Sequence, residues 1–378
     1  MSYRNTHLTQ AIINLDHLSH NMAILQNLAG DRPLFPAIKA NAYGHDAEII
    51  AKHLISMGYN MLCTAHISEA AELVEKGVDA TFIILSPTLA ENSQYLVDYG
   101  FQPVVCTLAQ VQALAIAAKD AEKKITIHVK VDTGMGRMGV KPDQIVSFLD
   151  ECKSYPEIIL GGICSHFPRA DETDLAFSHK QVETFREVKK NTECYNIPLY
   201  HIANSAALFA LPEARFDVVR PGITIYGLKP SASMQTPQLG ELKPVLSLKS
   251  RITLIKEVAQ GTGISYGHMH RTNSPALIAT IPLGYGDGLS RSLSNRLEVL
   301  IGGERCRQVG RICMDQCMVD VTHLKGRVLL GDEVVIIGSQ GSETISADDV
   351  AKEQGTINYE VVTAISRRVP RIIVSSSY

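Results

Sequence analysis

Lys39 is the residue of this chain whose type and position point most directly to chemistry. The apolar run 34–38 leads into it and a small polar segment with Gly44 follows, so the sequence predicts an amine at the carboxyl end of a buried strand. Barrel enzymes keep their reactive groups at that end of their strands. Partial burial there lowers the pKa of a lysine and makes it a Schiff-base nucleophile. The plain alternative is a surface lysine that follows a strand, because most lysines are exposed.

Cysteine and histidine spacings argue against a metal site. Eight cysteines are scattered along 378 residues, and no pair has the two-residue spacing of a zinc knuckle. Cys313 with Cys317, or His268 with His270, would need further ligands to complete a tetrahedral site. We therefore assign no metal, and a chain of this length does not need disulfide bonds to fold.

Short apolar runs alternate with helix-like segments over the first 228 residues. In residues 46–57 the apolar side chains recur at helical spacing, with Asp46 as a plausible N-cap and Gly58 as the stop. Strands that alternate with helices favour a parallel sheet, and eight of them predict a closed (β/α)8 barrel of the TIM type. A further helix, residues 16–28, precedes the first strand. The eight runs are 34–38, 61–65, 81–85, 103–106, 125–131, 159–165, 199–203 and 217–220.

The pattern changes after a polar, proline-bearing stretch, residues 229–243. Glycine-rich turns now separate the apolar runs, and one short helix, residues 346–353, interrupts them. We therefore expect an α/β barrel domain, residues 1–240, followed by a mostly β C-terminal domain, residues 241–378. The strands predicted in this second half are 246–258, 276–281, 296–301, 317–321 and 333–337.

Composition is ordinary for a globular enzyme. The chain is 45% hydrophobic and 20% charged, with a formal net charge of −3, so nothing suggests nucleic acid or an anionic membrane as a partner. The first residues lack the apolar stretch of a signal peptide, and no run reaches transmembrane length. We expect a cytoplasmic protein.

A series of segments resembles the alanine racemases, which are pyridoxal 5'-phosphate enzymes of fold type III. Each segment alone is a weak signal, but together, in order and with matching spacing, they are specific and span essentially the whole chain. The family's architecture, a barrel followed by a β domain, agrees with the elements predicted above. The segments are Ala37-Ile-Lys39-Ala-Asn-Ala-Tyr43-Gly-His45, Val129-Lys-Val-Asp-Thr-Gly-Met-Gly-Arg137-Met-Gly139, His201-Ile-Ala-Asn-Ser-Ala-Ala207, Val219-Arg-Pro-Gly-Ile-Thr-Ile-Tyr-Gly227, Gly263-Ile-Ser-Tyr266-Gly267, Leu283-Gly-Tyr-Gly-Asp-Gly288, Gly310-Arg-Ile-Cys-Met-Asp-Gln-Cys-Met318 and Asn358-Tyr-Glu360.

The resemblance implies two catalytic bases, Lys39 and Tyr266. Lys39 matches the lysine that holds the cofactor covalently and acts on one face of the substrate α-carbon. Tyr266 matches the base for the opposite face, which the family supplies from the other subunit. A phenol with a pKa of about 10 needs a positive environment to act as a base at neutral pH, and His201 and Arg220 match residues grouped around this tyrosine. Without the resemblance, Tyr266 reads as a turn residue of a β domain.

Further matches imply the cofactor-binding residues. Arg220 matches the residue that faces the pyridine nitrogen, and an arginine does not readily give up a proton, so this nitrogen would stay unprotonated. His166 matches a residue near the cofactor ring. In isolation, Arg220 reads as a strand-end arginine in a surface salt bridge and His166 as a core histidine. The implied phosphate ligands are Tyr43, Ser205, Tyr359 and the backbone amides of Gly222 and Ile223.

The substrate side is implied by three more positions. Arg137 matches a residue near the phenolic oxygen of the cofactor and the substrate carboxylate, while the Met314 amide and Asp315 match positions reached from the partner subunit. Some family members carry a carbamylated lysine where this chain has Lys130, which would turn a cation into an anion able to pair with Arg137. The sequence leaves both states of Lys130 open.

The resemblance implies an alanine racemase that works as a head-to-tail homodimer and supplies D-alanine for peptidoglycan. A racemase of broader range, or one for serine, is an alternative. A cofactor-binding carrier or regulatory protein on the same barrel is another, but such carriers lack the β domain, and a fold-type III decarboxylase fits the glycine-rich segments less well. A small pocket would separate the substrates, and its walls are not visible in the sequence.

Overall fold

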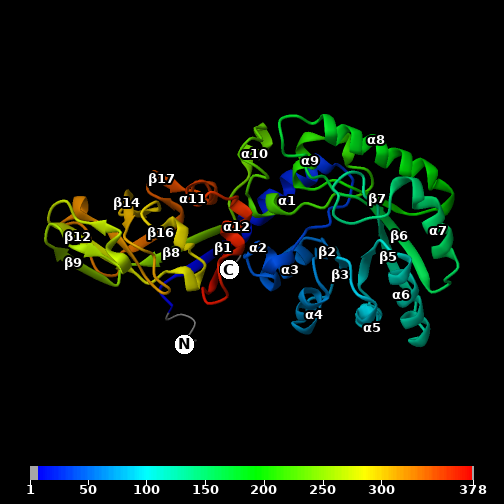
Figure 1. Cartoon of the computed structure of the whole chain (residues 1–378), viewed down its shortest axis with the longest axis horizontal. Coiled ribbons are helices and arrows are strands. Elements are labelled where there is room, and N and C mark those ends of the chain that lie inside the picture. Colours follow the sequence, from blue (N-terminus) through cyan, green and yellow to red (C-terminus); the bar gives the residue numbers. More distant parts are fainter. Residues whose placement is uncertain (1–6, 377–378) are drawn as a thin grey trace. The chain divides into compact units, whose positions relative to one another are not determined.

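The chain forms two compact units in the computed structural model, which describes residues 7–376 (Figure 1). The barrel unit contains residues 18–42 and 47–243. The β unit contains residues 7–17, 43–46 and 244–376. Within the described range, no helix combines the length and the apolar character that a membrane crossing would need.

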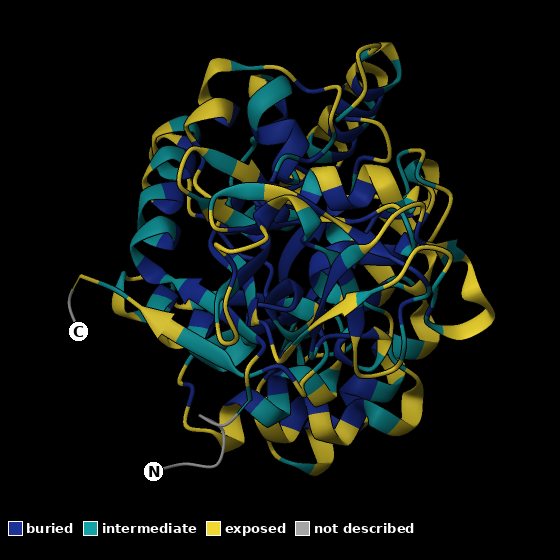
Figure 2. Cartoon of the chain, turned by 90° about the vertical axis from the view of Figure 1, so that its left-hand side faces the viewer, coloured by how far each residue is buried: buried dark blue, intermediate teal, exposed yellow. Residues whose placement is uncertain are grey.

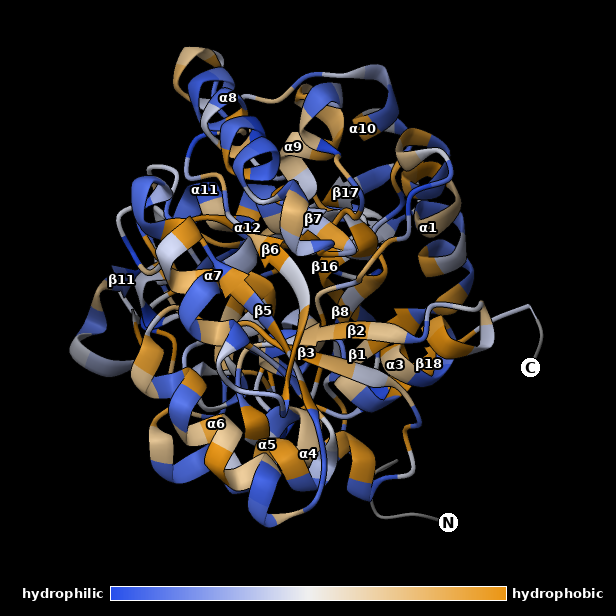
Figure 3. Ribbon diagram, turned by 90° about the vertical axis from the view of Figure 1, so that its right-hand side faces the viewer, coloured by the Kyte–Doolittle hydropathy of each residue, from blue (hydrophilic) through white to orange (hydrophobic). Residues whose placement is uncertain are grey.

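Regular parallel strands form most of the barrel and neighbour one another in chain order. Their residues are buried almost without interruption, because one face lines the barrel interior and the other is covered by helices. Figure 3 shows the hydrophobic residues that run along β5 and β6. The strands are β2 (Met61–Thr64), β3 (Thr81–Ile84), β4 (Gln102–Val105), β5 (Ile125–Lys130), β6 (Ile158–Cys164) and β7 (Leu199–His201).

Two irregular extended segments close the ring. Leu34 bridges to Val219 in parallel, and Ala37 bridges to β2. On the other side, Asp217 N donates to Tyr200 O of β7 at 3.0 Å. The eight-stranded parallel barrel predicted from the sequence is therefore confirmed, with its first and last members as short bridges rather than full ladders.

Prolines explain why these two members are irregular. Pro33 precedes the first segment, Pro36 lies within it and Pro221 follows the last, and a proline has no N–H to donate to a ladder. Their carbonyl groups still accept, and Ala37 N donates to Pro221 O at 2.8 Å. Closure thus depends on a short set of backbone hydrogen bonds, which also includes Phe35 N to Val219 O at 2.8 Å and Val219 N to Pro33 O at 3.1 Å.

Helices follow the strands as predicted. In α3 the buried side chains Ile50, Ala51 and Leu54 share one face, and the helix begins directly after Asp46, the predicted cap. The Asn41 side chain also accepts from Ala47 N at 3.0 Å. Much of α8 is hydrophilic in Figure 3, as expected for a helix with one face in solvent. The helices that lie wholly or mainly in this unit are α1 (Leu15–Ala29), α3 (Ala47–Ser56), α4 (Ile67–Glu75), α5 (Ser93–Tyr99), α6 (Leu108–Asp120), α7 (Ile145–Lys153), α8 (Ala176–Asn191), α9 (Ser205–Ala210) and α10 (Pro237–Glu241).

The β unit is built on one large mixed sheet with strand order β18-β1-β8-β16-β13-β14-β15-β12-β9. Burial alternates along β8, where Leu246, Leu248 and Ser250 are buried, because one face of this antiparallel strand covers the core. Figure 2 shows buried and exposed stretches alternating along the chain. The helices α11 (Ala347–Gln354) and α12 (Asn358–Thr363) complete the unit. The strands are β1 (Gln10–Asn14), β8 (Leu246–Arg251), β9 (Leu254–Val258), β10 (Gly263–Ile264), β11 (His270–Arg271), β12 (Ala276–Ile281), β13 (Glu298–Ile301), β14 (Glu304–Val309), β15 (Cys317–Asp320), β16 (Glu333–Gln340), β17 (Glu343–Ile345) and β18 (Arg371–Val374).

Strand β1 shows where the structure differs from the domain bounds expected from the sequence. Residues 1–240 were assigned to the barrel, yet β1 pairs in parallel with β18 and antiparallel with β8 in the β unit. The barrel unit ends at residue 243 and the β unit continues from residue 244, whereas the sequence predicts this boundary between residues 240 and 241. A five-residue strand whose partners lie more than 200 residues away leaves no local signal by which to assign it to a unit.

Candidate active site

Lys39 opens a turn of left-handed backbone geometry, α2 (Lys39–Tyr43). The next three residues have φ of 52°, 55° and 52°, a region that residues other than glycine rarely adopt, because their Cβ approaches the following carbonyl oxygen. Glu69 supports the turn by accepting a hydrogen bond from Ala40 N at 2.6 Å. The strand therefore ends abruptly at Lys39.

The surroundings of Lys39 favour its neutral amine. Its side chain is partly buried, and burial chiefly, together with the guanidinium groups of Arg137 and Arg220, lowers the pKa of Lys39 below the usual range. Cys63 and Glu69 act in the opposite direction, each with more effect than Arg220 but less than burial and Arg137. An amine that loses its proton readily at this position has the property required of a nucleophile and base.

Lys130, Arg137, His166 and Arg220 gather around the same end of the barrel. Lys130 is the last residue of β5 and is 7% exposed, and burial chiefly lowers its pKa to about 8, with Arg220 and Arg137 adding to the effect. Burial and the cations Lys130, Arg220 and Arg137 lower the pKa of His166 well below its usual value. This concentration of positive charge suits a ligand that carries a phosphate and a carboxylate.

Arg220 is buried and rigidly held. Its NH1 group donates to His201 Nδ1 and, at 2.9 Å, to His201 O, while NH2 donates to Ser165 O at 2.7 Å. A guanidinium has five N–H groups, so the Nε–H and one NH2 hydrogen have no partner among residues 7–376. These two remain for a ligand atom that accepts a hydrogen bond. His201 lies directly behind Arg220; the grouping of both residues around Tyr266, which the resemblance implied, stays a prediction.

Ser205, Gly222 and Ile223 come together at the start of α9. Ser205 Oγ accepts from Gly222 N at 2.8 Å and from Thr224 Oγ1 at 3.0 Å. A hydroxyl oxygen has two lone pairs, and both are used, so the Ser205 proton must be donated elsewhere. Gly222 N, expected as a phosphate donor, instead donates to Ser205 in this structure. The hydroxyl of Ser205 and the amide of Ile223 are the donors left for an anion.

The other two predicted phosphate ligands, Tyr43 and Tyr359, meet in the β unit. Their ring centroids are 6.1 Å apart with an interplanar angle of 52°. Gly44 makes this approach possible, since a Cβ there would lie 2.1 Å from Val362 O. The structure thus brings the predicted phosphate ligands together in two groups, one in each unit, and their joint role stays a prediction.

Tyr266, Met314 and Asp315 also belong to the β unit. Tyr266 starts the short helix η7 (Tyr266–His268) and is 72% exposed, and Met314 is 53% exposed. Tyr266 lines a groove with Cys313 at the base of the loop that carries Met314. Asp315 Oδ1 accepts from Arg368 NH2 at 2.8 Å. These side chains are presented to solvent in a single chain.

Several supporting residues escaped the sequence analysis. Arg368 also pairs with the buried Asp287 at 3.2 Å, and so links the Asp315 loop to the turn η8 (Tyr285–Asp287). Thr224 fills the second lone pair of Ser205. Glu69 could have been found as a helix-capping residue, because it is the third residue of α4 and accepts from His66 N. For Arg368 and Thr224 the sequence carries no comparable signal.

The residues present fit pyridoxal 5'-phosphate. Lys39 provides an amine with a lowered pKa, Arg220 provides spare N–H donors inside the barrel unit, and Ser205 provides a hydroxyl donor beside the N-terminus of α9. The cations around them match an anionic cofactor. The described residues contain no cluster of three or more His, Cys, Asp or Glu side chains that would hold a metal ion.

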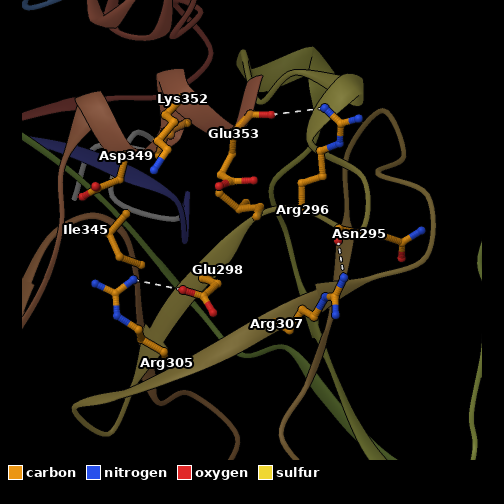
Figure 4. Close-up of a pocket in the computed structure, with 11 residues that line it drawn as sticks. Asn295, Arg296, Glu298, Arg305, Arg307, Ile345, Asp349, Lys352 and Glu353 are labelled. Carbon is orange, nitrogen blue, oxygen red and sulfur yellow. Dashed lines mark hydrogen bonds and ion pairs between the residues drawn. The ribbon is translucent and has the colours of Figure 1, made fainter. Parts of the chain in front are cut away.

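Another pocket in the β unit lies between the β13–β14 hairpin and α11, and no predicted site residue lines it (Figure 4). Its arginines are engaged by neighbours. Arg305 bonds to the Glu298 carboxylate, Arg307 to Asn295 O and Arg296 to Glu353 O. The pocket is therefore separate from the candidate site.

Known proteins match nearly the whole chain. The alanine racemase N-terminal domain family matches residues 13–230, and the alanine racemase C-terminal domain family matches residues 245–373. The alanine racemase of Clostridium novyi is 41% identical over 97% of this chain and 95% of its own length. That of Carboxydothermus hydrogenoformans is 43% identical over 96% and 99%.

Solved structures similar to this chain are also alanine racemases. Alanine racemase of Clostridium difficile 630 has a TM-score of 0.93 at 37% identity, covering 98% of this chain and 96% of that chain. The Bacillus anthracis alanine racemase with bound L-Ala-P has a TM-score of 0.92 at 35% identity, with coverages of 98% and 96%. The chain belongs to the alanine racemase family of pyridoxal 5'-phosphate-dependent isomerases.

Proposed function

We propose that this chain interconverts L- and D-alanine with two bases, Lys39 and Tyr266 of the partner subunit. The observation that carries the proposal is the presence in one unit of Lys39, a partly buried amine of lowered pKa, and of Arg220, a buried guanidinium held by hydrogen bonds. When bound, pyridoxal 5'-phosphate withdraws electrons from the α-carbon of an amino acid and makes the α-proton acidic. The protein must then move that proton on both faces of the carbon.

Lys39 acts on one face. Its amine is neutral more readily than a surface lysine, and the turn that begins at Lys39 fixes its backbone. Arg220 donates hydrogen bonds without giving up a proton, so it orients the ring nitrogen and leaves it unprotonated. Ser205 and Ile223 are the phosphate donors that we propose in the barrel unit, and Tyr43 and Tyr359 those that we propose in the β unit. Arg137, whose side chain is exposed, is free to bind the substrate carboxylate.

Tyr266 acts on the opposite face, which requires a second subunit. An aromatic side chain that is 72% exposed, beside the exposed Met314, is typical of an interface position. We infer a head-to-tail homodimer in which Tyr266, Met314 and Asp315 of each subunit enter the site of the other. The monomer would then lack one base and racemise poorly.

The product suggests the role. D-alanine is a building block of peptidoglycan, so we propose that the enzyme supplies this polymer's precursors in the cytoplasm. This part of the proposal is supported by family membership. A wider substrate pocket would give a broader substrate range that includes serine, and racemisation of L-serine tests this.

The decisive experiment incubates the purified, cofactor-loaded protein with L-alanine in D₂O and follows α-proton loss together with product chirality. Exchange accompanied by D-alanine supports the two-base racemase. Exchange with retained configuration would mean that only one base works, and absence of both would refute the function. L-serine in parallel measures the substrate range, and comparison of dilute with concentrated enzyme tests the need for a dimer.

A further inference from the structure

Behind Arg220, three more side chains continue a line of hydrogen bonds through the barrel wall. His201 Nε2 lies 2.9 Å from His128 Nδ1, and His128 Nε2 lies 2.9 Å from Gln102 Oε1. The two histidines are fully buried, and Gln102 is partly buried. The line therefore runs from the candidate site to β4 with no solvent at its histidines.

The strand β6 lies between β5 and β7, and it is shaped to let this line pass. His128 is the residue of β5 that faces Gly162 of β6, next to a register shift between Ile127 and His128. A Cβ at Gly162 would lie 2.5 Å from His128 Nδ1. Any larger residue would displace the ring that contacts His201. Bulges and glycines of this kind re-aim side chains near functional sites.

Hydrogen bonds along this line can be donated in one direction only, from Arg220 toward Gln102. An arginine side chain has donors only, so His201 Nδ1 must accept from Arg220. A neutral His201 then carries its proton on Nε2 and donates to His128 Nδ1. His128 in turn carries its proton on Nε2 and donates to the amide oxygen of Gln102. Both imidazoles are neutral, and both are the Nε2–H tautomer.

We propose that Gln102 and His128 are positioning residues for Arg220, with Gly162 providing the space that they need. The amide oxygen of Gln102 ends the line with an acceptor that cannot take the proton away. His201 is thereby kept as an acceptor toward Arg220, and the guanidinium keeps the orientation that presents its spare N–H groups to the cofactor. This rests on the role proposed for Arg220 above.

Burial supports the neutral state of both rings. Loss of water chiefly, with Arg220 nearby, lowers the pKa of His128 to about 3. The same causes, with His128 and Lys130 adding, lower the pKa of His201 well below its usual value. Neither ring is expected to titrate in the neutral range.

Replacing Gln102 by glutamate should reverse the line. A carboxylate at this position stabilises a proton on both nitrogens of His128, so His128 Nδ1 becomes a donor toward His201 Nε2. His201 then carries its proton on Nδ1, opposite the N–H of Arg220, and the two donors repel. Gln102→Met removes the acceptor without adding charge, so the direction set by Arg220 should persist.

The test uses the holoenzyme labelled with ¹⁵N-histidine and long-range ¹H–¹⁵N NMR, with signals assigned from His128→Asn. We expect the signals of His128 and His201 to show the Nε2–H tautomer and no titration between about pH 6 and 9 in the wild type. In Gln102→Glu we expect this pattern to be lost, the cofactor absorption band to change, and kcat/KM to fall about tenfold or more. Gln102→Met should keep the tautomers.

The exposed Gln144→Glu controls for added charge and should behave as wild type. A charged or Nδ1–H His201 in the wild type would overturn the proposal, as would a Gln102→Glu variant with unaltered tautomers and absorption. If Gln102→Glu fails to fold, the wild-type tautomers decide together with Gly162→Ala. That variant should displace the His128 ring and alter the His201 signal, and an unaltered signal would overturn the proposal. The NMR pattern tests the line even if the wild type proves inactive on alanine, so the two proposals fail separately.

Discussion

Lys130 offers a prediction whose size follows from its burial. Only the neutral amine of a lysine reacts with CO₂ to form a carbamate. With the pKa lowered from 10.5 to about 8, roughly a quarter of Lys130 is neutral at about pH 7.5, against about 0.1% for a free lysine. This is a gain of about 200-fold in the reactive form. A carbamate would also exchange an unpaired buried cation for an anion beside Arg137, so we expect Lys130 to be carbamylated.

The assay is ¹³C NMR of the protein in ¹³C-bicarbonate near neutral pH, where a carbamate carbon gives a resonance distinct from bicarbonate. The signal should appear in the wild type and in Lys180→Ala, an exposed-lysine control, and vanish in Lys130→Met. A wild type without the resonance, or a Lys130→Met variant that retains it, would refute the reasoning. Native mass spectrometry should show one added CO₂ that is lost on acidification.

Stability provides an independent readout with a definite sign. An unmodified Lys130 titrates at about 8 in the folded protein and near 10.5 when unfolded, so between these values the unfolded chain binds more protons and stability rises with pH. Below about pH 8 the cost of the buried ammonium is fully present, at about 3 kcal/mol. In CO₂-free buffer the free energy of unfolding of the wild type, relative to that of Lys130→Met, should therefore rise from pH 8 toward 10. The comparison removes the opposite effect of buried thiols such as Cys63 and Cys317, whose pKa burial raises to about 12. Saturating bicarbonate should flatten this rise.

Three further changes test the site. Ser205→Ala leaves Gly222 N and Thr224 Oγ1 without their acceptor and removes a phosphate donor; we expect about 1–3 kcal/mol lower stability and faster cofactor loss on dialysis, measured by absorbance. Tyr266→Phe should lower racemisation by about 100-fold or more while α-proton exchange of one enantiomer persists; equal loss for both enantiomers would contradict separate bases. Gly284→Ala should unfold at lower urea because its Cβ would lie 2.3 Å from Met314 O, whereas Gly240→Ala, with nothing within 4 Å, should not.

Much of the fold was predictable because local patterns repeat. Each barrel strand is a short buried run, and helices follow at regular intervals, so the eight-stranded barrel could be counted from the sequence. The β unit was predicted less completely. Strands β14, β17 and β18, the two-residue strands β10 and β11 and the N-terminal β1 were missed, and one expected strand, 246–258, is split into β8 and β9. Short strands with partial burial and distant partners carry little periodicity.

The resemblance predicts the residues of the candidate site, but not the residues that hold them in position. Lys39, Arg220 and Ser205 sit in recognisable segments, but their geometry depends on residues brought in by the barrel, such as Thr224 and His128. A histidine inside an apolar strand reads as an ordinary core residue. Its hydrogen bonds to His201 and Gln102 exist only because parallel strands align at that level and Gly162 leaves room.

The left-handed turn after Lys39 is the feature that sequence patterns hide most completely. Alanine favours right-handed helices, yet Ala40 has a φ of 52°, which costs about 1–2 kcal/mol. Its N–H bonds to Glu69 at 2.6 Å, and Asn41 Oδ1 accepts from Ala47 N at 3.0 Å, so neighbouring helices hold the strained turn in place. We infer that the strained turn is retained because it orients the side chain of Lys39.

Ala40→Gly follows from this argument. Glycine adopts the left-handed region without the Cβ penalty but loses about 0.5–1 kcal/mol through its freer unfolded chain. The variant should therefore be unchanged or up to about 1.5 kcal/mol more stable in urea unfolding. Ala71→Gly, in the middle of α4, should cost about 1 kcal/mol. If both variants lose the same stability, the turn is not strained in solution, and Lys39 must be positioned by other contacts.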